Sequence, residues 1–404
     1  MDRVSITNAN NSKKRFVSKY GDDSDKDYKV SIRKNKSIGD ILNVSDIVID
    51  EEGNEEFDEE KGIIVGNIRM GFGHYRISMT IASAANAMGY KQYWMDLNSY
   101  KNTACTKVIS AQNELYSKGS RISQKSRIFN KAVWEPVNYE AFRRLAYNLS
   151  DQKNSELMAP VFKNIPKKIP VVGTHVWPAQ AAIHAGMKNV VNAIPDNWPM
   201  ALHLAEGSVH TVQTHNAYQG YRILNGMAGR KVLKPMPQGS LYYTGHYVDY
   251  ELVENIEKDC EKRIERKRSG EPLRFLLSIG GAGAQKDIFK AIIKYLMKSI
   301  KKQKAALFIN VGDYKNVWDE LLEEIPELND VSTEHFDEFN DTRWFCNNAN
   351  DNRITGVHAF YHKDIFEAVY STKLLMRCCD VLVTKPSELL RLIPRCMYNH
   401  FKPK

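Results

Sequence analysis

The sequence predicts an α/β protein made of two doubly wound domains in tandem, preceded by a polar segment. The first observation is a strand, a glycine turn and a helix in succession between Lys61 and Gly89. The second is the return of the same pattern between Arg274 and Ile300. The third is a series of short apolar runs separated by helical patterns, which is typical of parallel strands joined by crossover helices.

The first of these stretches begins with the apolar run Ile63–Val65 and continues through Gly71 and Gly73 into a helical pattern. Glycines allow the backbone to approach a ligand, and the start of a helix leaves backbone N–H groups unpaired. His74 stands where the turn enters the helix. Because the turn lacks the full GxGxxG spacing, a ligand-binding turn and a structural one both remain open. A capping role and a catalytic role for His74 also remain open.

Composition limits the classes of protein that need to be considered. The chain has 404 residues, of which 43% are hydrophobic, enough for two ordinary domains. No apolar run approaches the roughly 20 residues of a membrane span, and the first residues lack the apolar core of a signal peptide. We therefore expect a cytoplasmic protein. The cysteines are scattered and form no CxxC, which argues against a zinc site or a disulfide framework.

The formal net charge of +9 would suit nucleic acid, an anionic membrane surface or a phosphorylated substrate. The basic residues are spread along the chain without a basic and aromatic block, which argues against nucleic acid. A peripheral contact with an anionic membrane surface stays open.

Residues 1–60 are predicted to form a polar N-terminal extension that ends in an acidic run. Within it, the β-branched runs Val30–Ile32 and Ile47–Ile49 predict an edge strand or two. The first domain is predicted over residues 61–244, with mostly helix over residues 104–165. Its further strands are expected at Lys91–Leu97, Lys168–Gly173, Asn189–Ile194 and Ser208–Thr214.

Loops at the carboxyl ends of parallel strands are where α/β sheets bind ligands. The first domain delivers four polar residues to such loops: His74, His175, Asp196 and Asn197. For Asp196, an Asx-turn ahead of the following Trp-Pro pair is the structural alternative.

The second domain is predicted over residues 245–404, after a boundary near Pro235–Gly245. A glycine-rich turn, Gly280–Gln285, follows its first strand, and Lys385–Glu388 follows its last strand and opens a helix. The strands are expected at Arg274–Ile279, Ala305–Val311, Ile354–His358 and Asp380–Thr384, and the helices at Glu251–Arg268, Asp287–Ile300 and Asp364–Cys378.

In this order, the parts resemble the GT-B glycosyltransferases of the UDP-glycosyltransferase and glycogen phosphorylase superfamily. The nearest group is that of the monogalactosyldiacylglycerol synthases and processive diacylglycerol glucosyltransferases. Its Gly-Gly-Gly-His turn is similar to Gly71–His74, and its Thr-His-Pro segment to Thr174–Pro178. Its second-domain glycine turn is similar to Gly280–Ala284, and its Thr-Lys-Pro-Gly-Gly turn to Thr384–Glu388.

The chain departs from the family pattern at three positions and at its end. Phe72 replaces a glycine, and Ser387 and Glu388 replace a glycine pair. The family continues past this turn with further sheet and helix. We therefore expect a second domain that is incomplete at Lys404.

The resemblance implies two Rossmann-like domains that face each other across a cleft. It implies transfer of a sugar from a nucleotide diphosphate donor, such as a UDP-sugar, to a lipid or cell-envelope acceptor. Lys385 would add a charge beside the diphosphate and Glu388 would hold the ribose, unless Glu388 is only a favourable first-turn carboxylate. The implied donor-binding residues are Gly280, Gly281, Gly283, Ala284, Gln285, Lys385, Ser387 and Glu388.

On the acceptor side, the resemblance implies that His74 acts as a base toward a hydroxyl and that Asp196 orients or assists it. The other residues expected on this side are Gly71, Gly73, His175 and Asn197. The candidate loops contain no Asp-x-Asp motif, so we expect neither a metal ion nor a cofactor.

Three other classes of function remain open. An epimerase that acts on a nucleotide sugar would share the donor contacts. The altered turns favour a catalytically inactive nucleotide-sugar-binding protein. A nucleic-acid-binding module is the least favoured. Fold alone does not choose among them.

Overall fold

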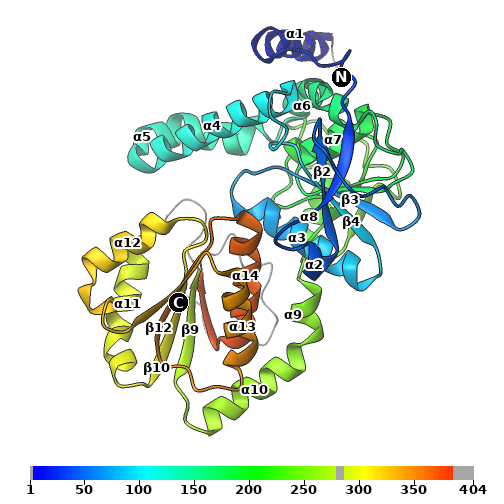
Figure 1. Ribbon diagram of the computed structural model, residues 1–404. Coiled ribbons are helices and arrows are strands. Elements are labelled where there is room, and N and C mark those ends of the chain that lie inside the picture. Colours follow the sequence, from blue (N-terminus) through cyan, green and yellow to red (C-terminus); the bar gives the residue numbers. More distant parts are fainter. Residues whose placement is uncertain (1–2, 279–285, 385–404) are drawn as a thin grey trace. The chain divides into compact units, whose positions relative to one another are not determined.

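The computed structural model describes residues 3–278 and 286–384 (Figure 1). The chain forms two compact units, each built on its own sheet: Met1–Met70 with Ala85–Tyr247, and Gly71–Ala84 with Val248–Lys404. The prediction of an α/β protein with largely parallel sheets is confirmed. In the part of the chain that the structure describes, no helix is both long enough and apolar enough to cross a membrane.

The first unit contains an eight-stranded sheet, sheet A, with the strand order β1-β2-β4-β3-β5-β6-β7-β8. β1 pairs antiparallel with β2, and the other neighbouring pairs are parallel. The strands are β1 (Val30–Lys34), β2 (Val44–Ile49), β3 (Gly62–Asn67), β4 (Lys91–Asp96), β5 (Val171–Gly173), β6 (Val190–Ala193), β7 (Val209–Val212) and β8 (Leu241–Tyr243).

Helices cover this sheet and bury an apolar core. Ile64 of β3 and Val171 of β5 belong to one cluster with Val108 of α4 and Phe162 of the 3-10 helix η3. The helical segments are α1 (Arg3–Tyr20), α2 (Gly39–Leu42), α4 (Ala104–Lys125), α5 (Arg127–Phe129), the π-helices η1 (Asn130–Trp134) and η2 (Val137–Ala141), α6 (Leu145–Ser155), η3 (Glu156–Phe162), α7 (Val176–His184), η4 (Ala201–His203) and α8 (His215–Arg222). α3 (Phe72–Ala87) begins in the residues of the second unit and ends in those of the first.

The N-terminal residues are part of the first unit. The two predicted edge strands are confirmed as β1 and β2. The helix α1 was not anticipated, because its sequence is polar and offers little apolar periodicity. It packs along α6, with Ala9 buried and with Phe16 and Val17 against the core. Tertiary packing therefore supports this helix.

Two glycines at strand ends allow α7 to pack closely against sheet A. A Cβ added at Gly66 would lie 2.8 Å from Cβ of Pro178, and one added at Gly173 would lie 3.1 Å from Cβ of Ala179. Pro178 occupies the first turn of α7, where its missing N–H costs no helical hydrogen bond. Because these two glycines have no side chains, the first turn of α7 can lie close to the sheet.

The second unit contains a five-stranded parallel sheet, sheet B, with the order β11-β12-β10-β9-β13. Its strands are β9 (Leu273–Ser278), β10 (Ala305–Asn310), β11 (Ser332–Phe336), β12 (Gly356–Tyr361) and β13 (Val381–Thr384). Its helices are α9 (Tyr250–Glu254), α10 (Ile256–Arg268), α11 (Lys286–Lys301), α12 (Lys315–Glu324), the 3-10 helix η5 (Pro326–Leu328), α13 (Phe339–Ala349) and α14 (Ile365–Cys378).

Sheet B is buried on both faces. Leu277 packs with Trp318 of α12 in one cluster, and the adjacent Leu276 packs with Phe345 of α13 in another. Figure 1 shows α11 and α12 on one side of the sheet and α13 and α14 on the other. Burial on both faces explains the continuous apolar run of β10, where alternation would mark a half-exposed strand.

The stretch between β10 and β12 was not predicted from the sequence. It contains α12, α13 and the edge strand β11. β11 has the sequence Ser332-Thr-Glu-His-Phe336, whose polar residues do not mark a strand. Its parallel pairing with β12 stabilises the extended conformation. β12 itself begins two residues later than predicted, at Gly356.

The close approach of α7 to sheet A can be tested with Gly66→Ala. We expect the added methyl group to displace Pro178 and to lower the free energy of unfolding by about 1–3 kcal/mol, measured by chemical denaturation. Gly73→Ala is the matched control, because its Cβ would meet no atom of the described residues within 4 Å. Equal losses in the two variants would show that the contact with Pro178 is not limiting.

Candidate functional site

The carboxyl edge of sheet A has a topological switch point between β3 and β5. The chain leaves β3 toward β4 on one side, and it leaves β5 toward β6 on the other. Connections that leave neighbouring strands in opposite directions open a crevice at the strand ends, which is the usual ligand site of doubly wound sheets. The predicted residues His175, Asp196 and Asn197 follow β5 and β6 at this edge.

Asn67, the last residue of β3, is a polar residue at this edge that the sequence analysis missed. Gly66 pairs with Gly173, so Asn67 stands beside Thr174. The Asn67 side chain is fully buried, and neither its oxygen nor its nitrogen has a hydrogen-bond partner among the described residues. Thr174 is satisfied, since its N–H donates to the Gly66 carbonyl over 2.8 Å. An unpaired buried amide is costly, which marks this position as unusual.

His175 is the N-cap residue of α7. Its Nδ1 accepts a hydrogen bond of 3.2 Å from the Trp177 N–H, and the two rings lie 4.7 Å apart. Because Nδ1 is the acceptor, the neutral ring carries its proton on Nε2. His175 therefore has a structural capping role in the described structure.

Asp196 belongs to a network that the sequence analysis missed in part. The carboxylate of Asp196 lies 3.2 Å from Nε2 of His203, and Nδ1 of His203 lies 2.8 Å from the hydroxyl of Tyr221. Asp196 is half exposed, whereas His203 and Tyr221 are buried. Burial raises the pKa of Tyr221 above its ordinary value, so the phenol stays protonated and can donate to His203. The arrangement orients an imidazole behind an accessible carboxylate.

Neighbouring side chains fix the loop that carries Asp196. Gln213, at the end of β7, donates to the Pro195 carbonyl over 2.7 Å. Asn192 of β6 donates to the His203 carbonyl over 2.6 Å. Asn197 is exposed beside Asp196. His203 and Tyr221 could not be predicted as partners of Asp196, because the three residues lie apart in the sequence and form no known motif.

The predicted residues Gly71, Gly73 and His74 belong to the second compact unit. Gly71 has φ +82°, a left-handed conformation that favours glycine, and His74 is half-buried in the first turn of α3. The ring of Phe72 lies against Gly312, which follows β10, and 5.9 Å from the ring of Tyr314. The start of α3 therefore packs at the carboxyl edge of sheet B.

A polar network continues this contact. Arg76 of α3 donates to the Thr372 hydroxyl over 3.3 Å, and Asn310, the last residue of β10, donates to the same hydroxyl over 3.0 Å. Nearby, Lys373 lies 2.8 Å from Glu251 and 3.6 Å from Asp249, and all of them are at least partly buried. Burial raises the pKa of Asp249, while Lys373 opposes that rise.

The residues predicted to bind the donor lie outside the described residues: Gly280, Gly281, Gly283, Ala284, Gln285, Lys385, Ser387 and Glu388. The strand ends that precede them are described. Ser278 of β9 pairs with Thr384 of β13 on one side and with Asn310 of β10 on the other. In sheet B the chain leaves β9 toward β10 on one side, and β13 lies on the other side of β9. In the described ranges, no group of three or more His, Cys, Asp and Glu side chains could hold a metal ion.

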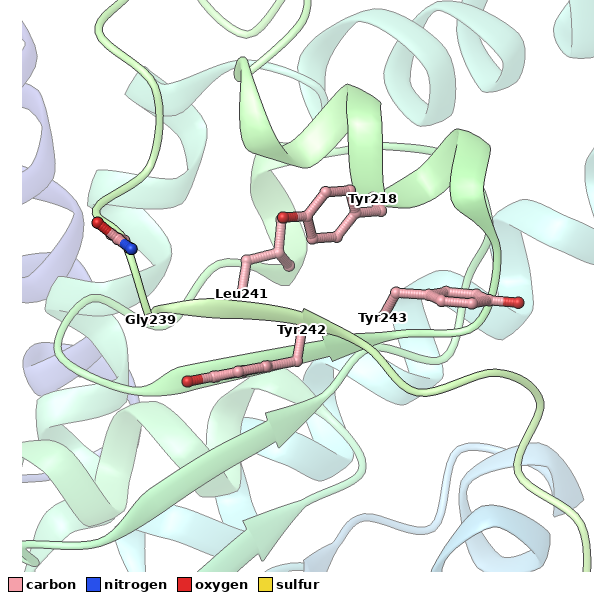
Figure 2. Close-up of a pocket in the computed structure, with 6 residues that line it drawn as sticks. Tyr218, Gly239, Leu241, Tyr242 and Tyr243 are labelled. Atoms are coloured by element: carbon pink, nitrogen blue, oxygen red, sulfur yellow. The ribbon is translucent and has the colours of Figure 1, made fainter.

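An open hollow of about 520 Å³ lies at β8, the edge strand of sheet A (Figure 2). Tyr218 of α8 reaches toward Leu241, and the ring of Tyr242 lies on the other side of the strand. The ring of Tyr243 lies 4.1 Å from that of His215, the first residue of α8, and is tilted against it. Half-exposed tyrosines offer aromatic faces and hydroxyls to a ring-shaped ligand. No motif or spacing in the sequence indicated these residues.

A family model described as a domain of unknown function (DUF6937) matches residues 1–223. A second model, also described as a domain of unknown function (DUF6938), matches residues 236–400. Searches of curated proteins and of solved structures found no match.

The network behind Asp196 can be tested with Tyr221→Phe. The substitution leaves Nδ1 of His203 and the N–H of Met200 without the buried phenol, so we expect the free energy of unfolding to fall by about 1–3 kcal/mol. Tyr218→Phe on the same helix is the control, because its hydroxyl makes no hydrogen bond among the described residues. If Tyr221→Phe left the free energy of unfolding unchanged, the Tyr221 hydroxyl would not stabilise the network.

Proposed function

The chain belongs to the DUF6937 family, and we propose that it is a GT-B glycosyltransferase that moves a sugar from a nucleoside diphosphate donor, such as a UDP-sugar. We place the donor on the second unit and an acceptor of lipid or cell-envelope type on the first. The proposal assigns no metal ion to the diphosphate. Backbone N–H groups of the glycine-rich segment and the charge of Lys385 would neutralise it instead.

The observation that carries the proposal is the pairing of Ser278 with Thr384. The segments Gly280–Gln285 and Lys385–Glu388 follow these residues almost directly in the sequence. The two predicted donor segments therefore follow neighbouring ends of parallel strands in sheet B. This is the position at which doubly wound sheets bind phosphate-bearing ligands.

The start of α3 supports the same assignment. Phe72 contacts Gly312 and Tyr314, which follow β10, and Arg76 contacts Thr372 of α14, in the unit that carries the donor strands. We propose that His74, between them, takes the proton of the acceptor hydroxyl. The acceptor oxygen then bonds to the anomeric carbon, and the nucleoside diphosphate leaves with the electron pair of the broken bond.

Residues 110–147 support an acceptor at a membrane surface. None of the described side chains in this range is buried, although the range is largely helical. α4 runs outward and η1 returns beside it, because Trp134 lies against Gly119 and 5.1 Å from the ring of Tyr116. We call this helical hairpin the arm. The large apolar side chains that it exposes are Leu115, Tyr116, Ile122, Ile128, Val133, Val137 and Tyr139.

The charge of the arm is one-sided near its tip. Between Leu115 and Trp134 there is no acidic residue, and the basic residues are Lys118, Arg121, Lys125, Arg127 and Lys131. Exposed apolar side chains among lysines and arginines are typical of helices that lie in the interface of an anionic bilayer. A substrate held in that bilayer would meet the protein on this side of the first unit.

The donor assignment predicts that the purified chain binds UDP in isothermal titration. Lys385→Ala should weaken that binding about tenfold, because it removes a charge beside the diphosphate. Lys315→Ala is the control, since Lys315 is a lysine of the same unit that pairs with Asp319. With UDP-sugars and membrane extract, mass spectrometry should detect a glycosylated acceptor that His74→Ala does not form.

Two results would contradict parts of this assignment. If neither UDP nor any other nucleoside diphosphate bound in isothermal titration, the proposed donor site would be wrong. Binding without any transferred sugar would leave a nucleotide-sugar-binding protein and would withdraw the role of His74.

The arm predicts sedimentation with vesicles that contain phosphatidylserine but not with vesicles of phosphatidylcholine alone, and a loss of binding at high salt. Lys125→Glu with Arg127→Glu should weaken the binding at least tenfold, at about 1 kcal/mol for each cation near the surface. Lys301→Glu with Lys302→Glu is the matched control for a change of net charge, because both lysines are exposed outside the arm. Equal losses in the two double variants would show that overall charge, and not the arm, drives binding.

A further inference from the structure

A second cavity, of about 180 Å³, lies within the first unit between α1, α4, α6 and α7. It is separate from the strand ends described above. Three aromatic side chains and one carboxylate line it, namely Phe16, Tyr147, Trp177 and Asp151. The polar residues that share the lining are Ser12, Gln112, Ser150 and Asn154, with Val108 and Met158 completing it. A cavity of this size holds a guest about as large as benzene.

The carboxylate of Asp151 is buried without a strong cation. Asp151 is 7% exposed, and its Oδ1 and Oδ2 accept the indole N–H of Trp177 at 2.9 and 3.0 Å from Nε1. The Gln180 amide, whose Nε2 donates to the Leu204 carbonyl over 3.0 Å, also favours the charged form of Asp151. Among the described residues no lysine or arginine lies within ion-pair distance of Asp151. Burial therefore raises the pKa of Asp151 to about 7, although the field of His203 opposes the rise.

Asn154 leaves a second acceptor unused in the same cavity. Its Nδ2 donates to the Ser12 hydroxyl over 3.1 Å, whereas its Oδ1 is buried and has no hydrogen-bond partner among the described residues. The lining therefore presents a carboxylate that lacks a cation and an amide oxygen that lacks a donor, together with three aromatic rings. A group that supplies N–H donors and a positive charge would satisfy both acceptors.

We propose that this cavity binds a small organic ammonium ion that carries at least one N–H. Its charge pairs with Asp151, an N–H reaches Oδ1 of Asn154, and its carbon chain packs against the rings of Phe16, Tyr147 and Trp177. Aromatic rings attract a desolvated cation through their negative faces, in addition to the pairing with the carboxylate. The carboxylate excludes an anion, and a divalent metal would require more oxygen ligands than Asp151 and Asn154 provide.

Asp151 is the group expected to pair with the ammonium ion, because the other charged and titratable groups around the cavity have other partners or remain neutral. Tyr147 lies beside it on α6, and burial raises the pKa of that phenol far above neutral pH. On α1, Lys13 pairs with Glu156 at 2.6 Å, and Lys153 of α6 pairs with the same carboxylate. His203 of η4 is the remaining group that acts on Asp151.

The test uses n-butylammonium and its neutral counterpart 1-butanol as probes of the full chain, followed by isothermal titration and Trp fluorescence. At about pH 8 we expect butylammonium to bind at least tenfold more tightly than butanol. Affinity for butylammonium should fall about tenfold between about pH 8 and pH 6, because protonation of Asp151 removes its charge. Binding below neutral pH should release a proton to the buffer.

Asp151→Asn is the decisive variant, because the amide oxygen still accepts from Trp177 while the charge is removed. It should abolish the preference for butylammonium over butanol and the pH dependence together. Phe16→Leu, at the other side of the cavity, should weaken butylammonium severalfold while both pH dependence and folding persist. Equal binding of the two probes, no binding of either, or unchanged selectivity in Asp151→Asn would each overturn the proposal and leave a hydrated packing void. Loss of UDP binding is not expected in any of these variants, so the outcome is independent of the proposed donor site.

Discussion

Parallel strand pairing is the constraint on which the rest of this structure depends. Parallel strands are buried on both faces, so their interiors accept apolar side chains and their polar residues are confined to the ends. β10 is buried throughout and ends in Asn310, β9 ends in Ser278, and β3 ends in Asn67. Because all carboxyl ends of a parallel sheet lie at one edge, these polar ends gather without any local sequence signal. The pairing of Ser278 with Asn310 and Thr384 is a direct consequence.

The close packing of α7 on sheet A connects two features of the first unit. Gly66 and Gly173 allow Pro178 and Ala179 to approach the strands, which fixes the start of the helix. His175 caps that start, and Trp177 in the first turn extends its indole to Asp151. The strand ends and the cavity under α1 are therefore positioned by one helix. A change in the approach of α7 would move both, even though they share no side chain apart from this turn.

The elements predictable from the sequence were those with a continuous apolar run between turn residues. β3, β9 and β10 fall within or near the predicted ranges, because burial on both faces requires such runs. β11 and α1 were not predictable, because their polar sequences are stabilised by a neighbouring strand and a neighbouring helix. Among the site residues, His175 and Asp196 followed from their places after strands. Asn67 was missed because its significance lies in full burial without a partner, which no spacing encodes.

Three other buried carboxylates of this protein contrast with Asp151. Asp259 is buried and receives two hydrogen bonds from Arg377, Asp249 has Lys373 at 3.6 Å, and Asp23 has Lys26 at 2.9 Å. In each case a strong cation offsets part of the cost of removing the charge from water. Asp151 accepts the indole N–H of Trp177 and lies near the amide of Gln180, and neither group carries a charge. A buried carboxylate without a nearby cation is either protonated or paired with a cation from outside the chain. The cavity beside Asp151 provides space for such a cation. The faces of the aromatic rings around that space attract a cation, whereas they gain no interaction from protonation of Asp151. The composition of the lining therefore favours an external ammonium ion over simple protonation as the state for which this cavity is built.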